Sequence, residues 1–127
     1  GSATAPMVGV ITAADAAAAR TVLGVTNVGA YTGQIETAAD KTYTIDPAAA
    51  TARTITGFYI KSASGTVTAT LKNGSDTVKA ASVSSSSGDQ DGLDASYTSV
   101  AVNGVISIVT TSNSSATDVI FSIEYTE

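Results

Sequence analysis

The fold is decided by the stretch YTSVAVNGVISIVTT, residues 97–111, in which apolar and polar side chains alternate on both sides of an Asn-Gly pair. The apolar positions that share a face within each run are Val100 and Val102, then Ile106 and Ile108. Asn103-Gly104 separates the runs, and such a pair is a strong hairpin signal because both central turn residues need a positive φ. The stretch therefore predicts two antiparallel strands joined by a tight turn.

A third alternating run, Asp118–Tyr125, continues this pattern toward the end of the chain. One face of the run carries its large apolar and aromatic side chains, Val119, Phe121, Ile123 and Tyr125. Three such strands can form a sheet with one buried face, on which earlier strands can pack. We expect this closing sheet to be the centre of the fold.

Upstream of the closing sheet, period-two alternation continues almost without a break from Ile35. The expected strands are Lys41–Ile45, Arg53–Lys61, Thr66–Lys72 and Ser75–Val83. Gly57 interrupts the alternation and predicts a bulge, and Asn73-Gly74 predicts a second tight turn. About eight short strands with turns every 8–12 residues are typical of an antiparallel β-sandwich or jelly roll, which is the expected fold class.

The N-terminal part of the chain has the pattern of one short α-helix. Thr12 can act as the N-cap, the alanine-rich run that follows favours helix, and Gly24 is placed to be the C-terminal cap. With about three turns, this helix is too short to be stable alone in water. One stripe carries its apolar residues, Ile11, Ala14, Ala18 and Val22. The stripe is expected to pack either on the chain's own sheet or on copies of itself around a symmetry axis.

The domain organisation follows from this change of pattern. Gly1-Ser2 is interpreted as the remnant of a cleaved tag. Residues 3–34 are expected to form a lead-in, the helix and a connector, Val25–Gln34, and residues 35–127 the β-sandwich domain. The length of 127 residues fits one domain. No repeat of fixed period is present, which argues against a solenoid or a propeller.

Composition restricts the classes of function. Charged residues are 13% of the chain, about half the usual share, so Ser, Thr, Asn and Gly must cover much of the surface. This composition is typical of an extracellular or virion β-protein. The net charge is −5 and the six basic residues are scattered, so the positive patch needed to bind nucleic acid is missing. No apolar run approaches the ~18–20 residues that span a bilayer, so no membrane insertion is expected.

Few catalytic constellations can be built from this sequence. Histidine and cysteine are absent, which excludes a Ser-His-Asp triad, a Cys-His dyad and a histidine zinc site. Carboxylates remain, but nothing in the sequence pairs them as hydrolysis of a glycosidic bond requires. We therefore expect a protein that is not an enzyme and that uses no cofactor.

Candidate ligand contacts are found in two segments that are expected to be exposed polar loops, Ser84–Asp94 and Ser112–Thr117. The first is long and rich in serine, and it is expected to be flexible. The first holds the acidic residues Asp89 and Asp91, whose spacing departs from a calcium loop because no Glu closes it. No metal is therefore assigned. The second holds Asn113. The tyrosines are further candidates, since an aromatic ring can stack on a sugar, although a strand tyrosine more often packs in a core. They are Tyr31, Tyr43, Tyr59, Tyr97 and Tyr125, of which Tyr97 is selected as a ligand contact.

The segment TAADAAAARTVLGV, Thr12–Val25, resembles a motif of bacteriophage tail fibres and related virion proteins. There it forms a short helix between fibre segments or before a terminal domain. The stretches KTYTID, GFYIKSASGTVTATLKNGSDTV and SNSSATDVIFSIEYT resemble a family of small β-domains of phage tail and virion proteins. Such proteins are typically homotrimers, which implies that the helix lies near the threefold axis, where the small side chains of Ala14 and Ala18 permit close approach.

The resemblance implies a structural domain of a phage or phage-like tail fibre or spike. Its partners would be two further copies, other virion proteins and a host receptor or cell-surface glycan, and its location the virion. Two alternatives remain open at this point. One is a stand-alone carbohydrate-binding module, and the other is a purely architectural joint or decoration protein.

Overall fold

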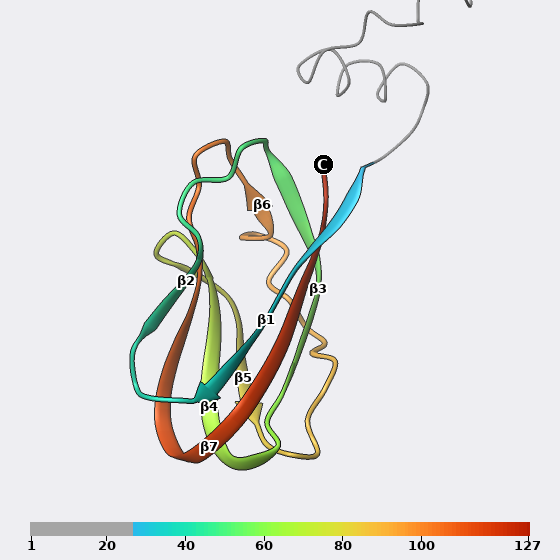
Figure 1. Ribbon diagram of the computed structural model, residues 1–127. Helices are drawn as coiled ribbons and strands as arrows, with labels where there is room; N and C mark the ends of the chain where they lie inside the picture. Colours follow the sequence, from blue (N-terminus) through green and yellow to red (C-terminus); the bar gives the residue numbers. More distant parts are fainter. Residues whose placement is uncertain (1–26) are drawn as a thin grey trace, which may run out of the picture.

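The computed structural model describes residues 27–127, which form a mainly β, antiparallel fold (Figure 1). The strands are β1 (Val28–Thr37), β2 (Thr42–Asp46), β3 (Arg53–Lys61), β4 (Ser64–Asn73), β5 (Asp76–Val83), β6 (Ser99–Val100) and β7 (Ile106–Thr126). Residues 27–127 contain no helix, so this part of the chain has no helix that is long and apolar enough to cross a membrane. The expected N-terminal helix, with Ile11, Ala14, Ala18 and Val22, lies outside the described residues, as does Gly1-Ser2.

The centre of the sheet is β7, which pairs with four other strands. Its first half pairs with β2 and β4, and its second half pairs with β1 and β3. Between the halves the strand bends at a segment that we call the corner, Ser112–Asp118. Ser112, Ser115 and Asp118 have positive φ angles of 52°, 54° and 48° there. Figure 1 shows the bend at the bottom of the molecule.

The corner divides the sheet into two arms that share one core. The first arm contains β1, β3, β6 and the second half of β7, and the second arm contains β2, β4, β5 and the first half of β7. Both arms contribute to one cluster of buried side chains, which includes Phe58, Ile60 and Ile123 from the first arm and Leu71, Ile106 and Ile108 from the second. Burial of these apolar side chains is the main source of stability.

At the corner, β3 and β4 bend together with β7. The register runs from Thr54↔Thr126 to Asn73↔Ile106, with Ser62 and Ala63 connecting the two strands. The Ala63 amide donates to the Thr117 carbonyl at 3.0 Å. Gly65 follows with a φ of 71°, and a Cβ added to it would lie 2.1 Å from the carbonyl oxygen of Ser115. The two chains therefore approach so closely that only glycine fits at residue 65.

Several local predictions are confirmed. The ladder between β3 and β7 shifts register between Ile55 and Gly57, which is the expected bulge. Gly74 has a φ of 62° in the tight turn between β4 and β5. In the second half of β7, Ile123 is fully buried whereas Ile120 is 42% exposed, as the alternation predicted.

The prediction of a hairpin around Asn103-Gly104 is wrong, although a turn forms there. Gly104 donates from its amide to the Ala101 carbonyl at 2.9 Å, and Asn103 has a φ of 67°. The strand before this turn, β6, pairs with β3 rather than with β7. Ala49 exchanges two backbone hydrogen bonds with the turn, so the turn connects the two arms instead of joining two paired strands.

Two further expectations are corrected. The connector expected at Val25–Gln34 contains most of β1, so the sheet begins before residue 35. Its glycines lie opposite aromatic rings, because a Cβ added to Gly29 would lie 2.6 Å from the Tyr125 ring. The segment Ser112–Thr117 was expected to be a loop between two strands, and it is the bend within β7.

The polar segment Ser84–Asp94 is a loop bound along the open edge between β3 and β5. Its backbone accepts a hydrogen bond from Ile60, donates one to Phe58 and donates one to Val78. Leu93 packs against the core. These contacts hold in place a loop that its serine-rich composition suggested would be flexible.

Candidate functional site

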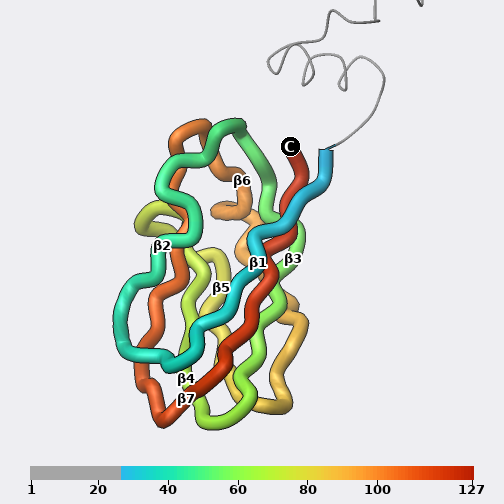
Figure 2. The backbone as a smooth tube through the Cα atoms, in the orientation of Figure 1, coloured from blue at the N-terminus to red at the C-terminus, as the bar shows by residue number. Residues whose placement is uncertain are grey.

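The described chain starts and finishes at the same end of the molecule. Val28 pairs with Thr126, and the Glu127 amide donates to the Asn27 carbonyl at 2.8 Å. Figure 2 shows the beginning of β1 beside the C-terminus, with the corner at the opposite end. We call these the terminal end and the corner end.

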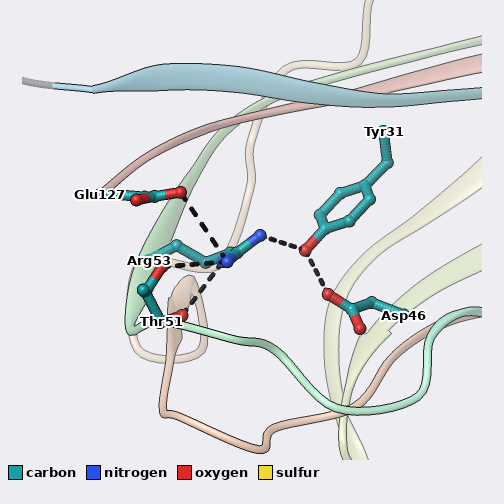
Figure 3. Close-up of polar contacts among 5 residues, drawn as sticks. All are labelled: Tyr31, Asp46, Thr51, Arg53 and Glu127. Atoms are coloured by element: carbon teal, nitrogen blue, oxygen red, sulfur yellow. Dashed lines mark hydrogen bonds and ion pairs between the residues drawn. The ribbon is translucent and has the colours of Figure 1, made fainter. Parts of the chain in front are cut away.

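A buried arginine organises the terminal end (Figure 3). Arg53 on β3 is 8% exposed, and its Nη1 donates to the Tyr31 hydroxyl at 2.5 Å. That hydroxyl donates in turn to Asp46 Oδ2 at 2.5 Å. The guanidinium also donates to the Thr51 carbonyl and hydroxyl at 3.1 and 3.0 Å, and Nη2 lies 3.8 Å from Glu127 Oε1. We call these five residues the Arg53 cluster.

Aromatic contacts complete the surroundings of this arginine. Its guanidinium carbon lies 4.6 Å from the centroid of the Tyr125 ring and 5.7 Å from that of Tyr31. The two rings are 5.0 Å apart and tilted. Cation–π contacts of this kind strengthen when water is excluded. Because the cluster joins β1, β2, β3 and the last residue, it fits the role of a structural clamp on both arms.

The tyrosine of the Arg53 cluster stays protonated over the usual pH range. Burial and the hydrogen bond to Asp46 raise the pKa of Tyr31 to about 12, although the charge of Arg53 acts in the opposite direction. The phenol therefore remains a hydrogen-bond donor to Asp46 at neutral pH. This raised pKa suits a structural hydrogen bond and does not suit acid–base catalysis, because a catalytic acid or base needs a pKa near the working pH.

The corner end carries a shallow depression of about 490 Å³. Its lining includes Tyr59, Lys61, Ser62, Ser85, Asp118 and Ile120. The volume lies within the range of ~300–1,000 Å³ that is common for small-molecule sites. A smaller depression of about 310 Å³ lies on the other side of the corner and is lined by Thr66, Thr68, Ser84 and Ser112, among others.

Three elements position the side chains of the larger depression. Lys61 on β3 is the register partner of Ile120 on β7, so both project from the outer face of the first arm. Asp118 ends the corner, and its Oδ1 accepts a hydrogen bond from Gln34 Nε2 at 3.1 Å. Ser85 belongs to a serine turn, residues 84–87, that is tied to β3.

The residues expected from sequence to contact a ligand are dispersed. Asp89 and Asp91 are exposed in the loop beside β3, and residues 27–127 contain no group of acidic side chains placed to hold a metal ion. Tyr97 is 39% exposed, and its carbonyl accepts a hydrogen bond from Asn73, at the end of β4 far from the corner. None of these three lines the larger depression.

Asn113 has a structural role in the corner. Its Nδ2 donates to the Ala38 carbonyl at 2.7 Å, and its Oδ1 accepts from the Ala116 amide at 3.2 Å. Both ends of the side-chain amide are therefore engaged by the backbone. Sequence reasoning named Tyr59 among the tyrosines that could stack on a sugar, but it missed Lys61 and Asp118. The position of Ile120 on an otherwise polar face was a usable signal.

Comparisons with known proteins give this chain no family. No family model matches it, and no curated protein and no solved structure matches it. The functional inference therefore rests on the residues and the geometry described above.

Proposed function

We propose that this chain is a non-enzymatic structural and recognition domain of the phage tail-fibre or spike type. In this proposal the two arms are the layers of a β-sandwich. The terminal end joins the sandwich to the preceding segment, residues 3–26, and the corner end recognises a receptor or glycan on a host surface. The proposal retains the virion location and the partners that the sequence resemblance implies.

The observation that supports this proposal most strongly is that different features gather at the two ends of the molecule. The start of β1, the last residue and the Arg53 cluster gather at the terminal end. Both depressions flank the corner at the opposite end. Ser112, Ser115 and Asp118 have left-handed backbone conformations in the corner. Strained residues of this kind persist where the surrounding structure holds them, and they cluster at ligand clamps and active sites.

The depression itself supports binding rather than catalysis. One carboxylate, that of Asp118, belongs to its lining, whereas hydrolysis of a glycosidic bond usually needs a pair of carboxylates on either side of the bond. The depression is also open, so a ligand in it would keep contact with water. A catalytic site gains much of its effect from excluding water.

The solution mass of the intact chain tests the trimer in this proposal. We expect about three times the chain mass of 12.6 kDa by light scattering behind size exclusion. Ala18→Glu places a charge on the expected helix stripe and should reduce the mass to that of one chain, while the far-ultraviolet spectrum keeps its β signature. Ala16→Glu, on the opposite side of the same expected helix, should leave the mass unchanged. A wild-type monomer, or an Ala18→Glu chain of unchanged trimeric mass, would count against assembly through this stripe.

One observation favours the architectural alternative. Within residues 27–127, β1 pairs with β7 alone, in a register without shifts, and it carries one charged residue, Glu36. Edge strands usually carry bulges, prolines or several charges that prevent pairing with another chain. An unprotected edge of ten residues could accept a strand from a neighbouring virion protein. A stand-alone carbohydrate-binding module, the other alternative, would be monomeric.

A further inference from the structure

The floor of the larger depression is apolar. Ile120 is 42% exposed, and the next outward positions on its strand are the polar residues Ser122 and Glu124. Tyr59 is the diagonal neighbour of Ile120 across the ladder, since it pairs with Ser122. Side chains related in this way lie within reach of each other when one is aromatic. An isoleucine and a tyrosine thus form a small apolar platform on a polar face.

The loop beside β3 fixes the position of this platform. Asp89 forms a β-bridge with Tyr59, and the backbone on either side is hydrogen-bonded to β3. A Cβ added to Gly88 would lie 3.4 Å from the Tyr59 ring, so the loop packs directly against that ring. A ligand would meet a ring that is already in place, which reduces the entropy lost on binding.

Two opposite charges flank the platform. Within residues 27–127, the Lys61 ammonium forms no hydrogen bond and no salt bridge, so its three donors are available. Asp118 accepts one hydrogen bond, from Gln34 to Oδ1, which orients the carboxylate and leaves Oδ2 as a free acceptor. The positive charge of Lys61 and the negative charge of Asp118 offset each other at the same depression, which favours a ligand without net charge.

The serine turn adds a hydroxyl to this rim. The Ser87 hydroxyl donates to the carbonyl of Ile60 at 3.0 Å and accepts from the Ser84 amide at 3.0 Å. The Ser62 amide donates to the Ser84 carbonyl at 3.2 Å. These bonds hold the exposed Ser85 at the edge of the depression.

We propose that this depression binds a neutral pyranose sugar, with the C–H face of the ring on Tyr59 and Ile120. A pyranose combines an apolar face with a rim of hydroxyl groups that both donate and accept. Lys61 would donate to one hydroxyl and Asp118 would accept from another, and charge-assisted hydrogen bonds are stronger than neutral ones. This inference names the ligand of the recognition surface and therefore rests on the proposed function.

A glycan array probed with the intact chain tests the inference. The array carries neutral hexose and N-acetylhexosamine oligosaccharides beside acidic ones, and titration calorimetry then follows the neutral sugar that binds. Tyr59→Ala and Lys61→Met should each weaken binding by about tenfold or more, as expected when a central contact is lost. Tyr97→Ala and Lys72→Met remove the same side-chain types away from the depression and should leave the affinity unchanged. Circular dichroism verifies that each variant is folded.

Every outcome bears on the inference. Binding of a neutral sugar that the two depression variants lose supports it. It is overturned if only acidic glycans bind, if folded Tyr59→Ala and Lys61→Met chains keep full affinity, or if Tyr97→Ala is the variant that loses binding. If the chain binds no glycan on the array but still binds bacterial cells, the assignment of a sugar ligand is overturned and the recognition role stands. If the chain binds neither the glycans nor the cells, the proposed function is overturned as well.

Discussion

Gly65→Ala should destabilise the fold by ~3–5 kcal/mol, because it forces the corner apart. An added Cβ would lie 2.1 Å from the Ser115 carbonyl oxygen and 2.5 Å from the Ala116 amide nitrogen. Both contacts are to backbone, which cannot rotate away as a flexible side chain can. The alanine would also have to adopt a φ of 71°, which L residues with a Cβ rarely do.

Gly74→Ala provides a matched control for this substitution. Gly74 has a φ of 62°, similar to that of Gly65, but an added Cβ would meet nothing within 4 Å. Only the backbone strain remains, so the cost should be about 1 kcal/mol. Urea unfolding followed by circular dichroism gives both free energies of unfolding. Equal losses for the two variants would show that close approach at the corner is not what requires glycine at residue 65.

Arg53→Ala should have the second largest effect, a loss of ~2–4 kcal/mol in the free energy of unfolding. The substitution removes the donor to the Tyr31 hydroxyl and the cation that contacts both tyrosine rings. It also leaves space where the aliphatic part of a nearly buried side chain packed. We expect the terminal end to open, with faster hydrogen exchange at the start of β1 and at the end of β7.

Arg53→Met separates packing from charge in the same cluster. Methionine keeps most of the aliphatic volume but donates no hydrogen bond, so it should recover part of the loss, to about 1–2 kcal/mol. Both variants are measured by urea unfolding against the wild-type chain. A change of less than ~0.5 kcal/mol for Arg53→Ala, which is the range of ordinary surface substitutions, would contradict the role of the clamp.

The elements that the sequence predicted well are those specified by neighbouring residues. The strands β3, β4 and β5 follow from alternation, and Gly57 and Asn73-Gly74 specify a bulge and a turn through their own backbone chemistry. The hairpin at Asn103-Gly104 was wrong because the partner of a strand is chosen over long range. β6 completes the edge of β3, a choice that no residue near the turn encodes.

The remaining misses also have physical causes. β1 was taken as a connector because Gly29 and Gly33 resemble loop residues, whereas they make room for the rings of Tyr125 and Phe121. The bend in β7 depends on left-handed serines, which carry no specific sequence signal. The candidate site could not be predicted for a related reason. Lys61 and Ile120 become neighbours only through the register of β3 on β7.

Site-specific blocking of each end tests most directly the claim that the corner end recognises a surface. The chain contains no cysteine, so Ser85→Cys at the corner end and Val102→Cys at the terminal end each provide one attachment point for maleimide-polyethylene glycol. Ser85 is exposed beside the larger depression, and Val102 is 55% exposed. Binding of the labelled chains to a panel of bacterial cells is measured by flow cytometry. We predict that the label at residue 85 abolishes binding and that the label at residue 102 leaves it unchanged. The account would be contradicted if the chain labelled at residue 102 loses binding to the cells while the chain labelled at residue 85 keeps it.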